Sequence, residues 1–316
     1  MAMPLVETKN LKKYFKTGAG MLHAVEDVNL KIMPGKTLGV VGESGCGKST
    51  LGRTILRLQP ATSGEVLYNG ENILKYKGKD KQKIHLNMQM VFQDPYSSLD
   101  PRMSVHNLIA EPVQVCGLLK TKAEINEHVR EIMDMCGLPA DQANLFPHEL
   151  DGGLRQRVGL ARAMAVSPKF IVCDEPVSAL DVSIQAQILN LLMDLQEQRE
   201  LSYMFITHDL CVVKHISDEI MVMYMGQVVE HAKTAELFAN PVHPYTKALL
   251  HAVPTIDLSK RNREGFMLRG EVTSPINPAP GCRFAPRCPY ATDKCKENVC
   301  LKEVSPDHFV ACSLCD

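Results

Sequence analysis

The sequence has almost no net charge and no long apolar run. Its 316 residues carry a formal net charge of −1, with 22% of residues charged and 45% hydrophobic. Composition therefore gives no electrostatic reason to expect a nucleic acid or an anionic membrane surface as partner. No apolar run approaches the ~20 residues of a membrane-spanning helix, so any work at a membrane would be that of a peripheral protein.

The sequence also lacks a secretory signal pattern, an internal repeat, a low-complexity tract and sustained heptads. The first ten residues show no basic segment followed by an apolar core, so we expect no secretion. Without secretion, the eleven cysteines are not expected to form a disulfide scaffold, because cytosolic thiols stay reduced. Six of them crowd the last 35 residues, and such crowding suggests a metal site.

Short apolar runs alternate with helical patterns along much of the chain. Strands are expected at 28–32, 38–41, 88–92, 170–173, 203–206 and 220–225, part of a hairpin or meander at 64–70, and helices at 48–58 and 184–195. This alternation predicts an α/β fold with a mainly parallel sheet. A helical stretch at about 96–167 interrupts it and is predicted to be a subdomain. After about residue 240 the chain becomes rich in proline and cysteine, which indicates a separate extension.

A glycine-rich segment follows the apolar run 38–41. Residues 42–50 fit the P-loop pattern G-x-x-x-x-G-K-[ST], in which glycines let consecutive N–H groups turn toward a phosphate. Lys48 is expected to contact the β- and γ-phosphates, and the Ser49 hydroxyl to bind Mg²⁺. The predicted nucleotide-binding residues here are Gly42, Ser44, Gly45, Cys46, Gly47, Lys48, Ser49 and Thr50.

An acidic pair ends the apolar run 170–173. Asp174 is expected to hold Mg²⁺, largely through water, and Glu175 to polarise the water that attacks the γ-phosphate. A solvated acidic pair at a strand end is the plainer alternative, and the P-loop argues against it. Together the two motifs predict an enzyme that hydrolyses ATP.

Between these motifs, residues 150–157 spell L-D-G-G-L-R-Q-R and residues 161–163 spell A-R-A. They resemble the signature of the ATP-binding cassette (ABC) family, whose usual form is L-S-G-G-Q. The resemblance implies that Gln93 is the glutamine loop and a Mg²⁺ contact, Asp181 the D-loop aspartate and His208 the switch histidine. It also implies that Phe15, or less favourably Tyr14, stacks on adenine. The soluble ABC proteins that act on ribosomes or DNA usually have two cassettes in one chain or a long coiled coil. This chain has one cassette and no sustained heptads, which argues against that class.

Three further segments, 93–102, 176–185 and 240–246, are similar to the ATPases of oligopeptide, dipeptide and nickel importers. The second of that family's two paired ATPases is the most similar. This implies a heterodimer with a sibling ATPase, two membrane-spanning permeases and an extracellular solute-binding protein, at the cytoplasmic face of the membrane. Peptides, nickel or a metal chelate stay open as cargo.

The resemblance also implies a domain plan. A P-loop cassette would occupy residues 1–240, with a mainly parallel sheet, an antiparallel β subdomain and the helical subdomain at about 96–167. A small cysteine- and proline-rich extension would occupy 241–316.

The signature departs from its usual form at Asp151 and Leu154, beside Gly152 and Gly153. In the family, a serine at the place of Asp151 donates a hydrogen bond to the γ-phosphate held by the partner. An ionised aspartate cannot donate, and its charge repels a phosphate, although it is an excellent helix N-cap. We therefore hypothesise that one composite ATP site is weak; a regulatory cassette with low turnover is the alternative.

Four cysteines near the end of the chain lie among prolines and glycines: Cys282, Cys288, Cys295 and Cys312. Four thiolates suit zinc or an iron–sulfur cluster, and the spacing lacks the close pairs of zinc ribbons. The family resemblance implies a [4Fe–4S] cluster; zinc and no metal at all stay open. Cys300 and Cys315 look like spares, though Cys315 could replace Cys312.

Overall fold

Two units, each assembled from separate stretches of the chain, make up the structure. The computed structural model describes residues 3–252, 275–297 and 299–315. The first unit comprises Ile32–Lys36 and Lys75–Ile206; the second comprises Met3–Lys31, Thr37–Leu74 and the described residues from Thr207 onward. Within the predicted extension 241–316, residues 253–274, 298 and 316 lie outside the described residues.

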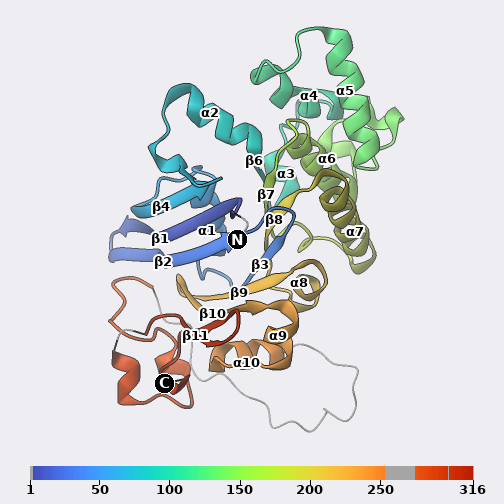
Figure 1. The fold of residues 1–316 in the computed structure, drawn as a ribbon. Helices are drawn as coiled ribbons and strands as arrows, with labels where there is room; N and C mark the ends of the chain where they lie inside the picture. Colours follow the sequence, from blue (N-terminus) through green and yellow to red (C-terminus); the bar gives the residue numbers. More distant parts are fainter. Residues whose placement is uncertain (1–2, 253–274, 298, 316) are drawn as a thin grey trace. The chain divides into compact units, whose positions relative to one another are not determined.

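The second unit contains an antiparallel sheet near the N-terminus. Its strands are β1 (Val6–Thr17), β2 (Gly20–Ile32), β4 (Ser63–Tyr68) and β5 (Glu71–Asn72), in the order β2-β1-β4-β5. The blue and cyan arrows in Figure 1 show β1, β2 and β4 side by side. Strand β4 pairs antiparallel with both β1 and β5, which confirms that 64–70 is part of a hairpin or meander, as predicted.

A second set of strands in this unit has the order β11-β12-β10-β9-β3. These strands are β3 (Thr37–Val41), β9 (Glu219–Tyr224), β10 (Gln227–Lys233), β11 (Lys302–Ser305) and β12 (His308–Val310). Strands β3 and β9 are parallel, and the other pairs are antiparallel. All five residues of β3 are buried, which explains its unbroken apolar sequence. The helices here are α1 (Lys48–Ile55), α8 (Leu210–Ile216), α9 (Thr234–Ala239) and α10 (Pro244–His251).

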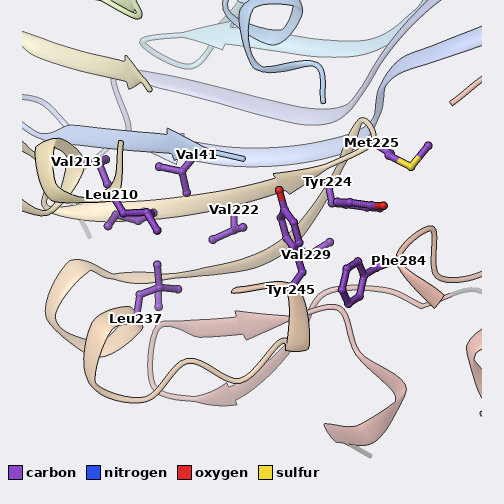
Figure 2. Close-up of a cluster of buried hydrophobic side chains, with 12 residues drawn as sticks. Val41, Leu210, Val213, Val222, Tyr224, Met225, Val229, Leu237, Tyr245 and Phe284 are labelled. Atoms are coloured by element: carbon purple, nitrogen blue, oxygen red, sulfur yellow. The ribbon is translucent and has the colours of Figure 1, made fainter. Parts of the chain in front are cut away.

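An aromatic core joins the C-terminal part of the chain to these strands. Tyr224, Tyr245 and Phe284 are each at most 1% exposed and come from β9, α10 and the segment before Cys288. Their ring centroids lie 4.8 to 5.4 Å apart, as edge-on and tilted aromatic pairs prefer. Figure 2 shows the three rings in one cluster. Proline and cysteine content therefore did not prevent this part of the chain from packing.

A buried carboxylate fixes the same region. Glu230 on β10 is 0% exposed and accepts hydrogen bonds from the backbone N–H groups of Val242 and His243, at 2.8 and 2.9 Å. His308 on β12 contacts the Glu230 Oε1 through Nε2 at 2.8 Å. The carboxylate is thus satisfied by the loop before α10 and by β12, as a buried charge requires.

The first unit has a parallel sheet of the order β8-β7-β6. Its strands are β6 (Met88–Val91), β7 (Phe170–Asp174) and β8 (Ser202–Ile206). Its helices are α2 (Gly78–Asn87), α3 (Pro95–Ser98), α4 (Val105–Val115), α5 (Lys122–Met135), α6 (Gly152–Met164) and α7 (Val182–Arg199). Helices α4, α5 and α6 pack on one another, and the predicted helical stretch contains them (Figure 1). The exact domain boundaries stay a prediction.

Short 3₁₀ turns complete the described structure, at Ile73–Lys75, Ala140–Asn144, Pro147–Glu149, Ala285–Arg287, Asp293–Lys296 and Ser313–Cys315. Over the part of the chain that the structure describes, none of the helices combines the length and apolar character needed to cross a bilayer.

Candidate functional site

The P-loop connects β3 to α1 in a conformation that only glycine adopts easily. Gly42, Gly45 and Gly47 have positive φ angles of 152°, 77° and 106°. A Cβ on Gly42 would lie 2.2 Å from the carbonyl oxygen of Met223, and one on Gly47 would lie 2.0 Å from that of Ala24. Backbone conformation therefore favours glycine at all three positions, and close backbone packing also requires it at Gly42 and Gly47.

Lys48 lies inside this loop. Its side chain is buried, and Nζ donates hydrogen bonds to the carbonyl oxygens of Gly42 and Glu43 at 2.8 and 3.0 Å. The loop thus holds an ammonium group at the start of α1, where the helix dipole adds positive potential. The same loop is anchored from outside, because Gly226 donates its N–H to the carbonyl of Cys46 at 2.8 Å. This combination can bind a polyphosphate.

The remaining P-loop side chains differ in exposure. Ser44 is exposed, whereas Ser49 and Thr50 are half-buried. Cys46 is 5% exposed, and burial raises the pKa of its thiol. Cys46 is therefore a packing residue of the loop rather than a reactive thiol.

The two aromatic candidates for adenine are adjacent on β1, so they lie on opposite faces. Tyr14 stacks on His23 with ring centroids 4.0 Å apart, and its hydroxyl donates to Glu26 at 2.6 Å. Phe15 is half-buried and lies under the Lys13 ammonium, 4.5 Å from the ring centroid. Burial opposes ionisation of Glu26, but hydrogen bonds from Tyr14 and His23 lower its pKa to about 2.

In the first unit, neighbouring parallel strands bring Gln93 and Glu175 together. Strands β6 and β7 end side by side, and the Gln93 Nε2 donates to the Glu175 Oε2 at 3.1 Å. Asp174 ends β7 and is 0% exposed. Glu175 has φ 48°, an unfavourable conformation for a residue with a side chain. The amide and the carboxylate form one polar group at the carboxyl edge of the sheet.

His208 follows β8 and is exposed. The preceding Thr207 donates its N–H to Val40 on β3 at 3.2 Å, and the following Asp209 caps α8 by accepting from Cys211 and Val212. The backbone on both sides of the histidine is thus fixed within the second unit.

The signature segment begins α6. Asp151 is its N-cap, and Oδ1 accepts from the Leu154 N–H at 2.8 Å, as its residue type predicts. Gly152 and Gly153 start the helix close to α7: a Cβ on Gly153 would lie 2.7 Å from Cγ2 of Ile184. Asp181 caps α7 in the same manner, since its Oδ1 accepts from Ile184 N–H at 3.1 Å. The motif residues thus have clear structural roles.

The arginines of α6 were not assigned roles from the sequence. Arg155 donates to the carbonyl of Pro147 at 2.7 Å, Arg157 to that of Cys136 at 3.1 Å, and Arg162 to that of Ser98 at 3.0 Å. Each arginine thus connects α6 to the end of a neighbouring helix or 3₁₀ turn. The sequence signal that could have indicated this role is the regular spacing of these arginines along a helix whose N-cap is Asp151.

The four predicted cysteine ligands all lie in the second unit, where the Cys282 N–H donates to the Cys295 carbonyl at 2.8 Å. Burial raises the pKa of the Cys282 thiol to about 11, and the Cys295 and Cys312 thiols raise it slightly further. Burial, together with the same two thiols, also raises the pKa of Cys288. All four are free cysteines. However, across residues 3–252, 275–297 and 299–315 no three potential ligands are grouped so as to hold a metal ion.

Comparison with known proteins identifies the family. The "ABC transporter" family model matches residues 25–178, and the family model "Oligopeptide/dipeptide transporter, C-terminal region" matches 229–295. The oligopeptide transport ATP-binding protein OppF of Bacillus subtilis is 49% identical over 315 residues, which cover 99% of this chain and 97% of OppF. AppF of the same organism, likewise an oligopeptide transport ATP-binding protein, is 47% identical over 98% and 97% of the two chains. The chain belongs to the oligopeptide-transporter family of ABC ATPases.

Solved structures of ABC cassettes are similar to this chain in fold. A dimeric post-hydrolysis state of the ATP-binding cassette MJ0796, bound to ADP and Pi, matches with a TM-score of 0.67 at 30% identity, over 72% of this chain and 98% of that one. The predicted α/β ABC cassette is thereby confirmed, whereas the separate C-terminal extension stays a prediction. As an ABC ATPase, the chain uses Mg²⁺ and water to convert ATP to ADP and phosphate.

Proposed function

We propose that this ABC ATPase powers the import of peptides through a membrane transporter. It would act at the cytoplasmic face of the membrane as a heterodimer with a sibling ATPase, below two permeases that receive solute from an extracellular binding protein. The near full-length similarity to oligopeptide transport ATP-binding proteins, including the C-terminal region, supports this proposal. ATP would join the two ATPases and hydrolysis would release them, driving the permeases between two states.

The buried lysine of the P-loop is the observation on which the chemistry depends. Lys48 would bind the β- and γ-phosphates, Ser49 and Asp174 the Mg²⁺, and Glu175 the attacking water. Gln93 would also contact the Mg²⁺, Asp181 and His208 would be the D-loop aspartate and the switch histidine, and Phe15 would stack on adenine. Tyr14 is the weaker candidate for adenine because its ring already stacks on His23.

Replacing Lys48 tests this assignment. We expect Lys48→Ala, in the chain co-purified with its sibling and permeases, to lower Mg·ATP affinity by at least tenfold and to abolish peptide-stimulated turnover. Glu175→Gln should keep ATP binding and lose turnover. Unchanged turnover in both variants would exclude the proposed chemistry, and stimulation by nickel or a metal chelate instead of peptides would change the cargo.

We further propose that the composite site containing this chain's signature hydrolyses ATP slowly. Asp151 caps its helix well but carries a negative charge and cannot donate to a phosphate. The other site, with Lys48, Glu175 and His208, would carry the turnover. The Asp151→Ser variant preserves the cap, since serine is an equally good N-cap, and restores a donor.

We expect Asp151→Ser to raise turnover several-fold in the reconstituted complex, with an unchanged melting temperature. Glu175→Gln should abolish turnover, while the sibling's equivalent change should reduce it only slightly. If instead the sibling's change abolishes turnover and Glu175→Gln does not, the two sites have been assigned the wrong way round. Low turnover in every variant would favour a regulatory cassette.

We also propose that Cys282, Cys288, Cys295 and Cys312 hold a [4Fe–4S] cluster. The free thiols of the four residues and the hydrogen bond between the Cys282 N–H and the Cys295 carbonyl support this proposal. The thiols are not arranged as a closed metal site among the described residues. Four thiolates are the usual ligands of such a cluster. Anaerobic purification followed by iron and sulfide assays tests the proposal: about four of each per chain are expected, and zinc or no metal would refute it.

A further inference from the structure

A short segment bounded by two cysteines carries three side chains into the second unit. Between Cys282 and Cys288, the side chains of Arg283, Phe284 and Arg287 have exposed fractions of at most 8%. Phe284 enters the aromatic core (Figure 2). The two arginines reach carboxylates on different parts of the nucleotide-binding region, and neither arginine belongs to a recognised ATP-site motif.

Arg287 contacts the P-loop itself. Its Nη1 donates to both carboxylate oxygens of Glu43, at 2.8 and 3.1 Å, and Glu43 is the residue after the first glycine of the loop. The Arg287 side chain is 8% exposed and that of Glu43 is 25% exposed. A pair this well buried interacts much more strongly than a solvated surface pair.

The backbone of Glu43 is also fixed by a residue from the C-terminal part of the chain. The Glu43 N–H donates to the hydroxyl of Tyr245 at 2.9 Å, and Tyr245 is fully buried on α10. The Arg287 guanidinium lies near the ring and hydroxyl of Tyr224, with 3.4 Å between Nη1 and the hydroxyl. Glu43 is therefore fixed at both its backbone and its carboxylate by residues that follow the motifs in the chain.

Arg283 makes the corresponding contact at β2. Its Nη2 donates to Oε2 of Glu26 at 3.0 Å, and its Nη1 donates to the carbonyls of His23 and Met225. Glu26 accepts the hydroxyl of Tyr14, on the strand that carries the adenine candidates. One segment of seven residues thus contacts both the P-loop and the neighbourhood of β1.

A carboxylate in a phosphate-binding loop is electrostatically unfavourable. An uncompensated negative charge at Glu43 would repel the triphosphate, and this repulsion is poorly screened where the charge is half-buried. Arg287 compensates the charge and, through two contacts to one carboxylate, restricts its rotation. The Lys48 ammonium, bound to the Glu43 carbonyl at 3.0 Å, depends on the same stretch of backbone.

We propose that Arg287 is a positioning residue for ATP binding: by neutralising and orienting Glu43 it sets the affinity of the P-loop for the triphosphate. The segment between Cys282 and Cys288 is then a functional support of the nucleotide site rather than an appendage. Arg287 acts through Glu43 and does not touch ATP.

Equilibrium binding of Mg·ATP to the purified full-length chain tests this proposal. We expect Arg287→Gln to raise the dissociation constant about tenfold, because it leaves the Glu43 charge uncompensated. Arg287→Lys should retain part of the affinity, since one nitrogen makes both contacts. In a Glu43→Gln background, Arg287→Gln should change the dissociation constant less than twofold, because the charge it compensates is gone.

A matched control is available in the exposed ion pair Lys233–Asp307, which also joins the C-terminal part of the chain to β10. Asp307→Asn should leave ATP affinity within twofold of the natural chain. The melting temperature without nucleotide separates a folding defect from a binding defect. Equal affinity of Arg287→Gln and the natural chain overturns the proposal, as does an undiminished effect in the Glu43→Gln background. If Arg287→Gln does not fold, the dissociation constants of Arg287→Lys with and without Glu43→Gln provide the same test.

Discussion

Glu175, which we propose as the residue that polarises the attacking water, has an unfavourable backbone conformation. Its φ of 48° lies in the left-handed region, where a residue with a side chain is strained by ~1 kcal/mol or more. The backbone is held there by its N–H bond to Ile206 at 2.9 Å, and its carbonyl accepts from Ser178. The conformation directs the carboxylate of Glu175 to Gln93. Backbone strain that surrounding hydrogen bonds maintain is expected where a residue is kept for function at the expense of stability, which agrees with the proposed role of Glu175.

We therefore expect Glu175→Gly to raise the free energy of unfolding by ~1 kcal/mol, since glycine adopts this conformation without strain, while abolishing ATP turnover. Chemical denaturation and a phosphate-release assay measure the two effects. Glu200→Gly is the matched control: Glu200 ends α7 with φ 53° and is exposed, so the stability gain should appear with turnover intact. A destabilised Glu175→Gly protein would contradict the strain argument.

Helix α6 is positioned by its first turn and by its arginines. Asp151 caps it, Gly153 allows it to approach α7, and Arg155 and Arg162 hold the surrounding loops. A helix moves as a nearly rigid element. The position of the signature segment at the start of α6 therefore depends on the contacts that Arg155 and Arg162 make further along the helix. Gly159, further along the same helix, differs sharply from Gly153, because a Cβ there would have no neighbouring side chain of the described residues within 4 Å.

Alanine substitution at these two glycines should therefore have opposite effects. Gly153→Ala places a methyl group 2.7 Å from Ile184 and should destabilise the fold by ~1–3 kcal/mol. Gly159→Ala meets open space and should stabilise it by up to ~1 kcal/mol, because alanine has the higher helix propensity. Denaturant titration with a constant slope measures both, and equal effects would show that helix packing does not require Gly153.

Residues distant in the sequence hold the second unit together around buried polar groups. His243 is 1% exposed, caps α10 by accepting the Tyr245 N–H through Nδ1, and donates its own backbone N–H to Glu230. Burial lowers the pKa of His243 from 6.5 to about 4. The acceptor role of Nδ1 requires the neutral ring, in agreement with that direction.

This pKa shift predicts a loss of stability on mild acidification. Below pH 6.5 the unfolded chain protonates His243 while the folded chain does not until about pH 4, so acid favours unfolding across this window. The free energy of unfolding should fall by ~3 kcal/mol between the two values from this residue alone. His243→Asn keeps a cap acceptor but does not titrate, and should show that much less pH dependence. Identical profiles for the two proteins would refute the assignment.

Sequence patterns were sufficient where neighbouring residues carry the information. The P-loop, the acidic pair after β7, the cap at Asp151 and the buried strands all depend on spacing within one element. Local hydrogen bonds and backbone sterics leave few alternatives at such short range. The α/β class followed from the same periodicities.

Contacts across the chain could not be obtained in this way. Glu43 and Arg287 are 244 positions apart, and Glu230 and His308 are 78 apart. Composition alone did not indicate that a proline- and cysteine-rich segment would supply two strands to the sheet and an arginine to the P-loop. Many arginines can pair with many carboxylates at similar energy, so the choice among them is made only when burial and the packing of Tyr224, Tyr245 and Phe284 bring one pair together.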